Sequence, residues 1–142
     1  MHESIVRRIA EANVADKVWL AGVRADIPEL LRAMDCFVLP SLSEATSCTL
    51  QEAMATALPI IATQVGGNAA LLDDGRYGSL VPSENVTALA AEMLKQYGLR
   101  GKQANLAARE SIVEQYGLSA VLARYDNVFS RALSSAQRAH LA

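Results

Sequence analysis

The stretch "CFVLPSLSEATSCTLQEAMATALPIIAT", residues 36–63, holds two apolar runs on either side of a polar loop and an Ala- and Met-rich segment. Short continuous apolar runs of this kind are typical of strands that are buried on both faces of a parallel sheet. The segment between them, at about residues 49–57, contains mostly good helix formers. Strand, helix and strand in this order predict a βα unit with parallel strands.

The rest of the chain extends this unit in both directions. Upstream, the spacing of apolar residues predicts a helix over about residues 3–13, a strand over 18–21 that stops at Gly22, and a helix capped by Asp26. Downstream, "GSLV" at 78–81 predicts another buried strand, and a short helix is expected within 68–74. We therefore expect an α/β fold with a Rossmann-like, doubly wound parallel sheet of about four strands.

The last third of the sequence is predicted to be wholly helical. Asn85 can cap a helix that ends at Gly98, a second helix is expected over about residues 101–116, and a third begins near Ser119. The apolar stripes of these helices indicate a helical C-terminal tail that covers the sheet.

Length and composition indicate one domain, residues 1–142. The net charge of −2 gives no electrostatic reason to expect nucleic acid as a partner. The sequence has no apolar run of the about 20 residues that a membrane span needs and no signal-peptide pattern, so we expect a cytoplasmic protein without a membrane span. Cys36 and Cys48 have no metal-ligand spacing, so neither a metal nor another cofactor is expected, and Cys36 is expected to be buried.

The candidate ligand site lies where the strands end. Ligands of open α/β sheets bind at the carboxyl ends of the strands, and three loops are expected there, at residues 22–26, 41–49 and 64–68. The middle loop leads into a helix, and the first amides of a helix have no partner within it. Such amides bind anions, so a phosphate or diphosphate is expected at these positions. The backbone N–H groups concerned are those of Ser47, Cys48, Thr49 and Leu50.

Two glutamates eight positions apart flank this anion site. Glu44, in the loop, can accept hydrogen bonds from the hydroxyls of a sugar, and Glu52, which we place on the first turn of the helix, can accept from a vicinal diol such as a ribose. The structural alternatives are that Glu52 is favoured by the helix dipole alone, that Glu44 is merely solvated, and that Cys48 serves packing.

The segment "VLPSLSEATSCTLQEAMATALPIIATQVGGN", residues 38–68, resembles the signature of retaining GT-B-fold glycosyltransferases of group 1, or family 4 type. The signature belongs to their C-terminal, donor-binding domain. The resemblance implies that Glu44 is catalytic and contacts the transferred sugar, and that Glu52 binds the ribose of the nucleotide. It also implies that the amides near Thr49 and Leu50 bind the diphosphate.

The resemblance extends over about residues 3–133 and assigns two further groups. Val23 and Arg24, directly after Gly22, are implied to border the base, and Gly66 and Gly67 are implied to be loop contacts. The sequence departs from the family pattern in a few places. Ala45 and Thr46 stand where the family has Gly and an aromatic residue, Ala57 stands for a common Gly, and Ala70 stands for a common Glu.

The implied function is the donor-binding portion of a glycosyltransferase that moves a sugar from a nucleotide diphosphate sugar to an acceptor with retention. Family enzymes have an acceptor-binding domain first, and then a strand and loop with an Arg and a Lys that neutralise the leaving diphosphate. Since the resemblance starts after both, we expect no transfer by the 142-residue chain alone.

Two other functions compete with this one. The first is a non-catalytic α/β binding or assembly module that is derived from such an enzyme. The second is an unrelated doubly wound domain, which is disfavoured because the sequence has neither a GxGxxG fingerprint nor a P-loop. The pattern leaves the sugar, the base and the acceptor open.

The resemblance also bears on assembly. In the family's sheet two strands lie between the counterparts of residues 18–21 and "CFVLP", so "CFVLP" is expected at an edge here. An apolar edge strand is a template for pairing. Either residues 18–21 pair with "CFVLP" to give a four-stranded sheet, or two chains form a homodimer by edge pairing or by exchange of the N-terminal segment. We favour the homodimer.

Overall fold

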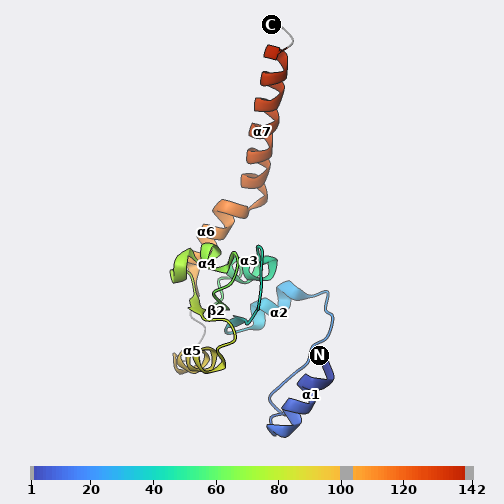
Figure 1. Ribbon diagram of the computed structural model, residues 1–142, viewed down its shortest axis with the longest axis vertical. Coiled ribbons are helices and arrows are strands. Elements are labelled where there is room, and N and C mark those ends of the chain that lie inside the picture. The colour runs from blue at the N-terminus through green and yellow to red at the C-terminus, as the bar shows by residue number, and fades with distance from the viewer. Residues whose placement is uncertain (1, 100–103, 140–142) are drawn as a thin grey trace.

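The computed structural model describes residues 2–99 and 104–139, with side chains through residue 133. Two helices come first, short parallel strands and helices then alternate, and the last third is helical (Figure 1). In chain order the elements are α1 (His2–Glu11), α2 (Ile27–Ala33), β1 (Phe37–Leu39), α3 (Cys48–Ala55), β2 (Ile60–Thr63), α4 (Asn68–Leu71), the 3₁₀ turn η1 (Asp73–Gly75), β3 (Ser79–Val81), α5 (Val86–Gly98), α6 (Leu106–Tyr116) and α7 (Leu118–Ala139).

The sheet of the described residues has three parallel strands in the order β1-β2-β3. Val38 of β1 lies opposite Ile61 of β2, and Ala62 of β2 lies opposite Leu80 of β3. All residues of the central strand are buried, as the apolar run predicts. The expected α/β class with parallel strands is confirmed, and β1 is an edge strand as expected.

The fourth expected strand is absent, so the prediction for residues 18–21 is wrong. The side chain of Trp19 is 66% exposed, and α1 has no buried residue. Figure 1 shows α1 standing away from the sheet. A strand needs a neighbour for its N–H and C=O groups, and these residues have no strand beside them. Residues 18–21 therefore form an extended arm together with α1.

The core lies between the sheet and α3. Leu50 and Met54 of α3 and Leu58 after it are fully buried, and burial of each such side chain contributes about 1.5–3 kcal/mol to folding. α6 packs on α3 through Ala108 and Ile112, which are also buried. The remaining members of this cluster are Leu31, Ala53, Ile60, Ala62, Leu71 and Leu72.

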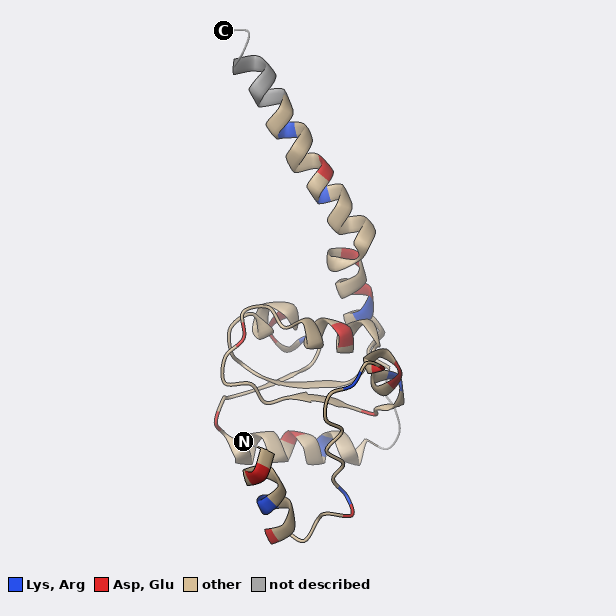
Figure 2. Ribbon diagram, turned by 90° about the vertical axis from the view of Figure 1, so that its right-hand side faces the viewer, with Lys and Arg blue, Asp and Glu red and all other residues tan. Residues whose placement is uncertain are grey.

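The C-terminal helices cover the sheet only in part. α5 contacts β2 and β3, and Figures 1 and 2 show it on the side of the sheet opposite to α3. α7 extends away from the domain in both views, and its apolar residues Tyr125, Val128 and Phe129 are exposed. The expectation that the whole tail covers the sheet is therefore wrong for α7, whose apolar stripe is not covered by the residues that the structure describes.

The end of α3 explains the unusual Ala57. Leu58 N–H donates to the Ala53 carbonyl at 3.2 Å and Ala57 N–H to the Met54 carbonyl at 2.9 Å, which is a Schellman motif. The residue at the centre of this motif adopts left-handed dihedrals, and Ala57 has a φ of 57°. Glycine is the usual residue there because it has no Cβ. Ala57 therefore carries local strain that a glycine would not.

Asn105 joins α6 to the sheet domain. Its side chain accepts from Ala108 N–H at 3.2 Å and donates to the Tyr77 carbonyl at 2.7 Å. Its main-chain N–H donates to the Ala57 carbonyl at 2.8 Å. α6 thus begins at Leu106; of the residues expected to start this helix, 101–103 lie outside the described residues.

We predict that Asn105→Ala lowers the free energy of unfolding by about 2 kcal/mol, from one lost cap and one lost bond to Tyr77. The matched control is Asn85→Ala, because Asn85 caps α5 through one bond to Ala88 N–H and is exposed. That variant should lose only about 1 kcal/mol. Urea unfolding curves measure both, and equal losses would contradict the tie to Tyr77.

Candidate functional site

The N-terminus of α3 is organised by Ser47. This buried residue is the N-cap, and its Oγ accepts from Leu50 N–H at 3.3 Å and lies 3.1 Å from Thr49 Oγ1. The expectation that Leu50 offers an unpaired amide is therefore wrong. Within the described residues, the amides of Cys48 and Thr49 have no hydrogen-bond partner, and they remain available to an anion.

The two glutamates differ in environment. Glu44 is half-buried, and Ser41 Oγ donates to its Oε1 at 2.7 Å. Glu52 is exposed and is the fifth residue of α3, so it lies on the second turn and not on the first turn as expected. The carboxylate that is held in place is thus the one in the loop, and the helical one is free to meet a ligand.

The loop after β2 lies directly against the loop with Glu44. Gly66 has a φ of +49°, and a Cβ at this position would come within 1.5 Å of the Glu44 carbonyl oxygen. At Gly67 a Cβ would come within 2.3 Å of the Ala45 carbonyl oxygen, which accepts from Gly67 N–H at 3.0 Å. Only glycines permit this approach, so the structure brings the Gly66–Gly67 pair and the backbone of Glu44 together. That either glycine contacts a ligand stays a prediction.

Sequence reasoning did not single out three residues that support this site, namely Ser41, Thr63 and Asn68. Thr63 Oγ1 donates to the Ser41 carbonyl at 2.6 Å, and Asn68 Nδ2 donates to the Thr63 carbonyl at 3.0 Å. Asn68 is fully buried, and its Oδ1 has no partner among the described residues. The available signal was position, because Thr63 ends a strand at the ligand edge and Asn68 directly follows the Gly–Gly pair.

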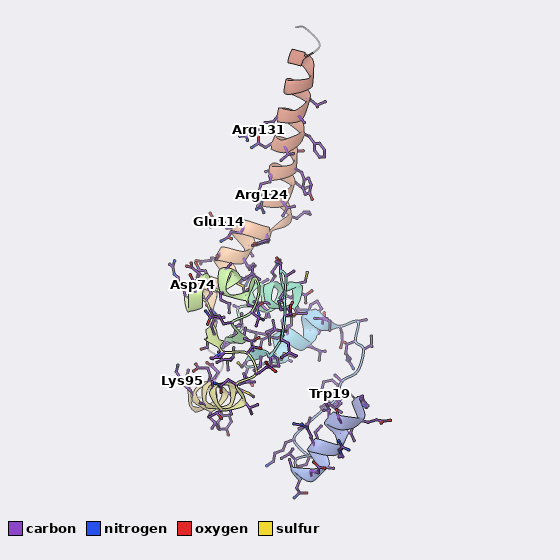
Figure 3. The ribbon with its side chains drawn as sticks, viewed as in Figure 1. Trp19, Asp74, Lys95, Glu114, Arg124 and Arg131 are labelled. Carbon is purple, nitrogen blue, oxygen red and sulfur yellow. The ribbon has the colours of Figure 1, made fainter. Side chains whose placement is uncertain are left out.

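The Gly22–Arg24 segment directly follows the arm. Val23 is fully exposed, Arg24 is paired with Asp26 through Nε and Oδ1 at 2.8 Å, and its guanidinium lies 5.5 Å from the ring centroid of Trp19. This pairing lowers the pKa of Asp26. The Asp26 carboxylate was expected to cap α2, but it makes no hydrogen bond to the start of that helix. No hydrogen bond or ion pair of the described part of the chain joins residues 22–24 to the loop at 41–49. Figure 3 labels Trp19, which lies beside Arg24, and the contact of residues 22–24 with a base stays a prediction.

The cysteines differ from each other. Cys48 is exposed at the start of α3, so the packing role is not seen. Cys36 is half-buried, and this burial raises the pKa of its thiol. The described residues contain no group of three or more His, Cys, Asp or Glu side chains that could hold a metal ion. Across the same residues, the longest helices are too polar or too short to cross a bilayer.

A parallel sheet with a loop and a helix N-terminus following its first strand defines a Rossmann-like α/β domain. Residues 2–98 match the family model of the glycosyl transferases group 1, and the chain belongs to this family. The sequence is 36% identical over 110 residues to the lipopolysaccharide core biosynthesis mannosyltransferase LpsB of Rhizobium meliloti. The matched region covers 73% of this chain and 31% of that protein.

Solved structures confirm the fold. The chain superposes on Anabaena HepE in complex with UDP with a TM-score of 0.83 at 23% identity, over 91% of this chain and 36% of that chain. A glycosyltransferase from Rickettsia africae gives a TM-score of 0.82 at 25% identity, over 93% and 37%. The chain thus spans about a third of the length of these relatives. The resemblance to the C-terminal domain of GT-B-fold glycosyltransferases is confirmed.

We predict that Gly66→Ala disrupts the contact between the two loops, because the added Cβ meets the Glu44 backbone. The matched control is Gly75→Ala. Gly75 also has a positive φ, of +102°, but nothing lies within 4 Å of an added Cβ. The control should lose only the about 1–2 kcal/mol of a left-handed alanine, and Gly66→Ala should lose clearly more. Thermal unfolding of both variants measures this, and similar losses would contradict the close approach.

Proposed function

We propose that this chain is the donor-binding portion of a glycosyltransferase and binds a nucleotide diphosphate sugar. The observation that carries the proposal is the arrangement at the end of β1. The half-buried Glu44, held by Ser41, lies in the loop that leads directly to the open amides of Cys48 and Thr49. A carboxylate for sugar hydroxyls and amides for a diphosphate therefore stand side by side in the chain. Family membership and the fold shared with a UDP-bound protein support it.

The roles of the two glutamates follow from their environments. In the proposal Glu44 contacts the transferred sugar, and transfer proceeds with retention and without a metal. Glu52 is exposed and lies one turn after Cys48 on α3. In the proposal it accepts hydrogen bonds from the ribose diol. Gly22, Val23 and Arg24 border the base, a role that needs the arm to approach the sheet. We place this binding in the cytoplasm; the inactivity of the 142-residue chain alone remains a prediction.

We predict that Glu52→Ala weakens binding of UDP and of UDP-sugars alike, by about 1.5–3 kcal/mol, the range for a hydrogen bond to a charged group. Glu44→Ala should spare UDP and weaken only the UDP-sugar. Glu110→Ala removes an exposed carboxylate from α6 and is the matched control, with no expected effect. Calorimetric titrations with UDP, UDP-glucose, GDP and GDP-mannose measure these losses.

Equal losses of nucleotide and nucleotide sugar in both glutamate variants would refute this division of roles. If the unaltered chain takes up none of the four ligands at millimolar concentration, the donor-binding function itself is wrong. The assembly module would then be the better description of this domain.

A second proposal concerns assembly and has its own observation. Among the described residues β1 has a strand on only one side. A groove of about 790 Å³ lies beside it, lined by Val38 and Ile61 of the sheet and by Met93 and Tyr97 of α5. The arm of the same chain exposes apolar side chains, including Trp19. We propose that two chains form a homodimer in which the arm of each packs on the β1 edge and groove of the other.

We predict a particle of about twice 15.2 kDa by light scattering at micromolar concentration. Leu20→Asp should yield the monomer, because Leu20 lies within the apolar part of the arm, residues 18–21, and is 41% exposed in the single chain. Val23→Asp adds the same charge at a fully exposed position outside this part and should leave the dimer intact. A soluble monomer of the unaltered chain would refute the homodimer.

A further inference from the structure

We propose that Thr63 is a positioning residue that sets the orientation of Glu44 toward the donor sugar. The inference rests on the proposed function, because it assigns a task to a residue that lies behind the sugar-binding carboxylate. Thr63 is 4% exposed, so it cannot itself touch a ligand that lies at the carboxyl edge of the sheet.

The first link between Thr63 and Glu44 lies where the hydrogen-bond ladder between β1 and β2 ends. Phe37 N–H donates to the Pro59 carbonyl at 2.9 Å. In a parallel pair, every second residue of a strand makes main-chain hydrogen bonds to the neighbouring strand. By this alternation, the next main-chain bonds beyond Leu39 would involve Ser41 and Thr63. The strand pairing stops at Leu39 and Ala62, and side chains take over from there.

Thr63 makes the first of these side-chain bonds. Its Oγ1 donates to the Ser41 carbonyl at 2.6 Å, and the Leu39 carbonyl lies at 3.4 Å from the same oxygen. Ser83 Oγ reaches the Ser41 carbonyl only at 3.5 Å, the limit of a hydrogen bond, so Thr63 is the main donor. Ser41 is thereby fixed by its backbone at the exit of the sheet.

Ser41 then transmits this position to the carboxylate. Its Oγ donates to Glu44 Oε1 at 2.7 Å, so the residue that Thr63 holds by its carbonyl holds Glu44 by its side chain. A hydrogen bond from a hydroxyl to a carboxylate is charge-assisted and stronger than one between two neutral groups. This bond therefore fixes the direction of the carboxylate. Movement of the Ser41 backbone would therefore turn Glu44.

The other side of Thr63 is anchored as well. Asn68 Nδ2 donates to the Thr63 carbonyl at 3.0 Å, and Asn68 is fully buried at the start of α4. Gly67, the residue before it, donates its amide to the Ala45 carbonyl at 3.0 Å. The loop with Glu44 is thus fastened at residue 41 by Thr63 and at residue 45 by Gly67, and Glu44 lies between the two fastenings.

The test uses variants of Thr63 in the full 142-residue chain. Thr63→Val keeps the shape and removes the hydroxyl, and Thr63→Ser keeps the hydroxyl. Thr56→Val is the matched control, because Thr56 Oγ1 donates to the Glu52 carbonyl at 2.8 Å at the far end of α3. Thr63→Val should bind UDP-glucose and GDP-mannose about tenfold more weakly, which corresponds to about 1.4 kcal/mol and to one lost hydrogen bond.

Binding of UDP and GDP should be unchanged in Thr63→Val, and Thr63→Ser should restore the affinity for the sugar nucleotides. A second measurement needs no ligand. Hydrogen exchange of the Gly67 amide should be about tenfold faster in Thr63→Val and unchanged in Thr63→Ser and Thr56→Val, because the loop that accepts from this amide is released. Unfolding curves confirm that each variant is folded.

The outcomes separate the inference from the function on which it rests. If the unaltered chain binds sugar nucleotides and Thr63→Val binds them equally well, Thr63 has no positioning role and the proposed function stands. Equal losses of UDP and UDP-glucose would also overturn the inference, since a merely structural role affects both ligands. If the unaltered chain binds no nucleotide sugar, the proposed function fails, and this inference fails with it.

Discussion

At the carboxyl end of β2 the hydrogen bonds of the sheet pass from main chain to side chains, and the ligand edge depends on this change. The bond from Thr63 Oγ1 to the Ser41 carbonyl, at 2.6 Å, lets the chain leave the sheet after β1 and still remain attached to it. From there the chain can present Glu44 and turn into α3. Because Thr63 is buried, water does not compete for this bond.

Two further constraints complete the edge. Gly66 and Gly67 let the loop after β2 lie against the backbone of Glu44 and Ala45, so a loop from later in the sequence packs directly on the loop with Glu44. Ser47 takes up the Leu50 amide, which fixes the start of α3 and leaves the amides of Cys48 and Thr49 for a ligand. The resulting site has ordered acceptors on one side and open donors on the other, an arrangement that suits a sugar joined to a phosphate.

Much of this architecture could be predicted from the sequence because its signals are local. The apolar runs around Pro40 and Pro59 predict β1 and β2, and caps such as Asn85 predict where helices begin. The position of the loop with Glu44 could be predicted because it lies between a strand and a helix. The open amides of Cys48 and Thr49 could be predicted because they begin that helix. The failures concern partners. Within the described part of the chain, residues 18–21 have the composition of a strand but no strand beside them, and the apolar stripe of α7 is left exposed.

The sequence by itself determined the class of the domain and the family, and it singled out Glu44 and Glu52 as candidates, because periodicity, turn residues and a motif are properties of neighbouring positions. Only the tertiary structure decided which groups are free and which are engaged. It placed Glu52 on the second turn of α3, gave the Leu50 amide to Ser47, and joined Thr63 to Ser41 across 22 residues of chain. Such contacts depend on the packing of β2 beside β1, which brings distant residues within hydrogen-bond distance, and no local pattern records that distance.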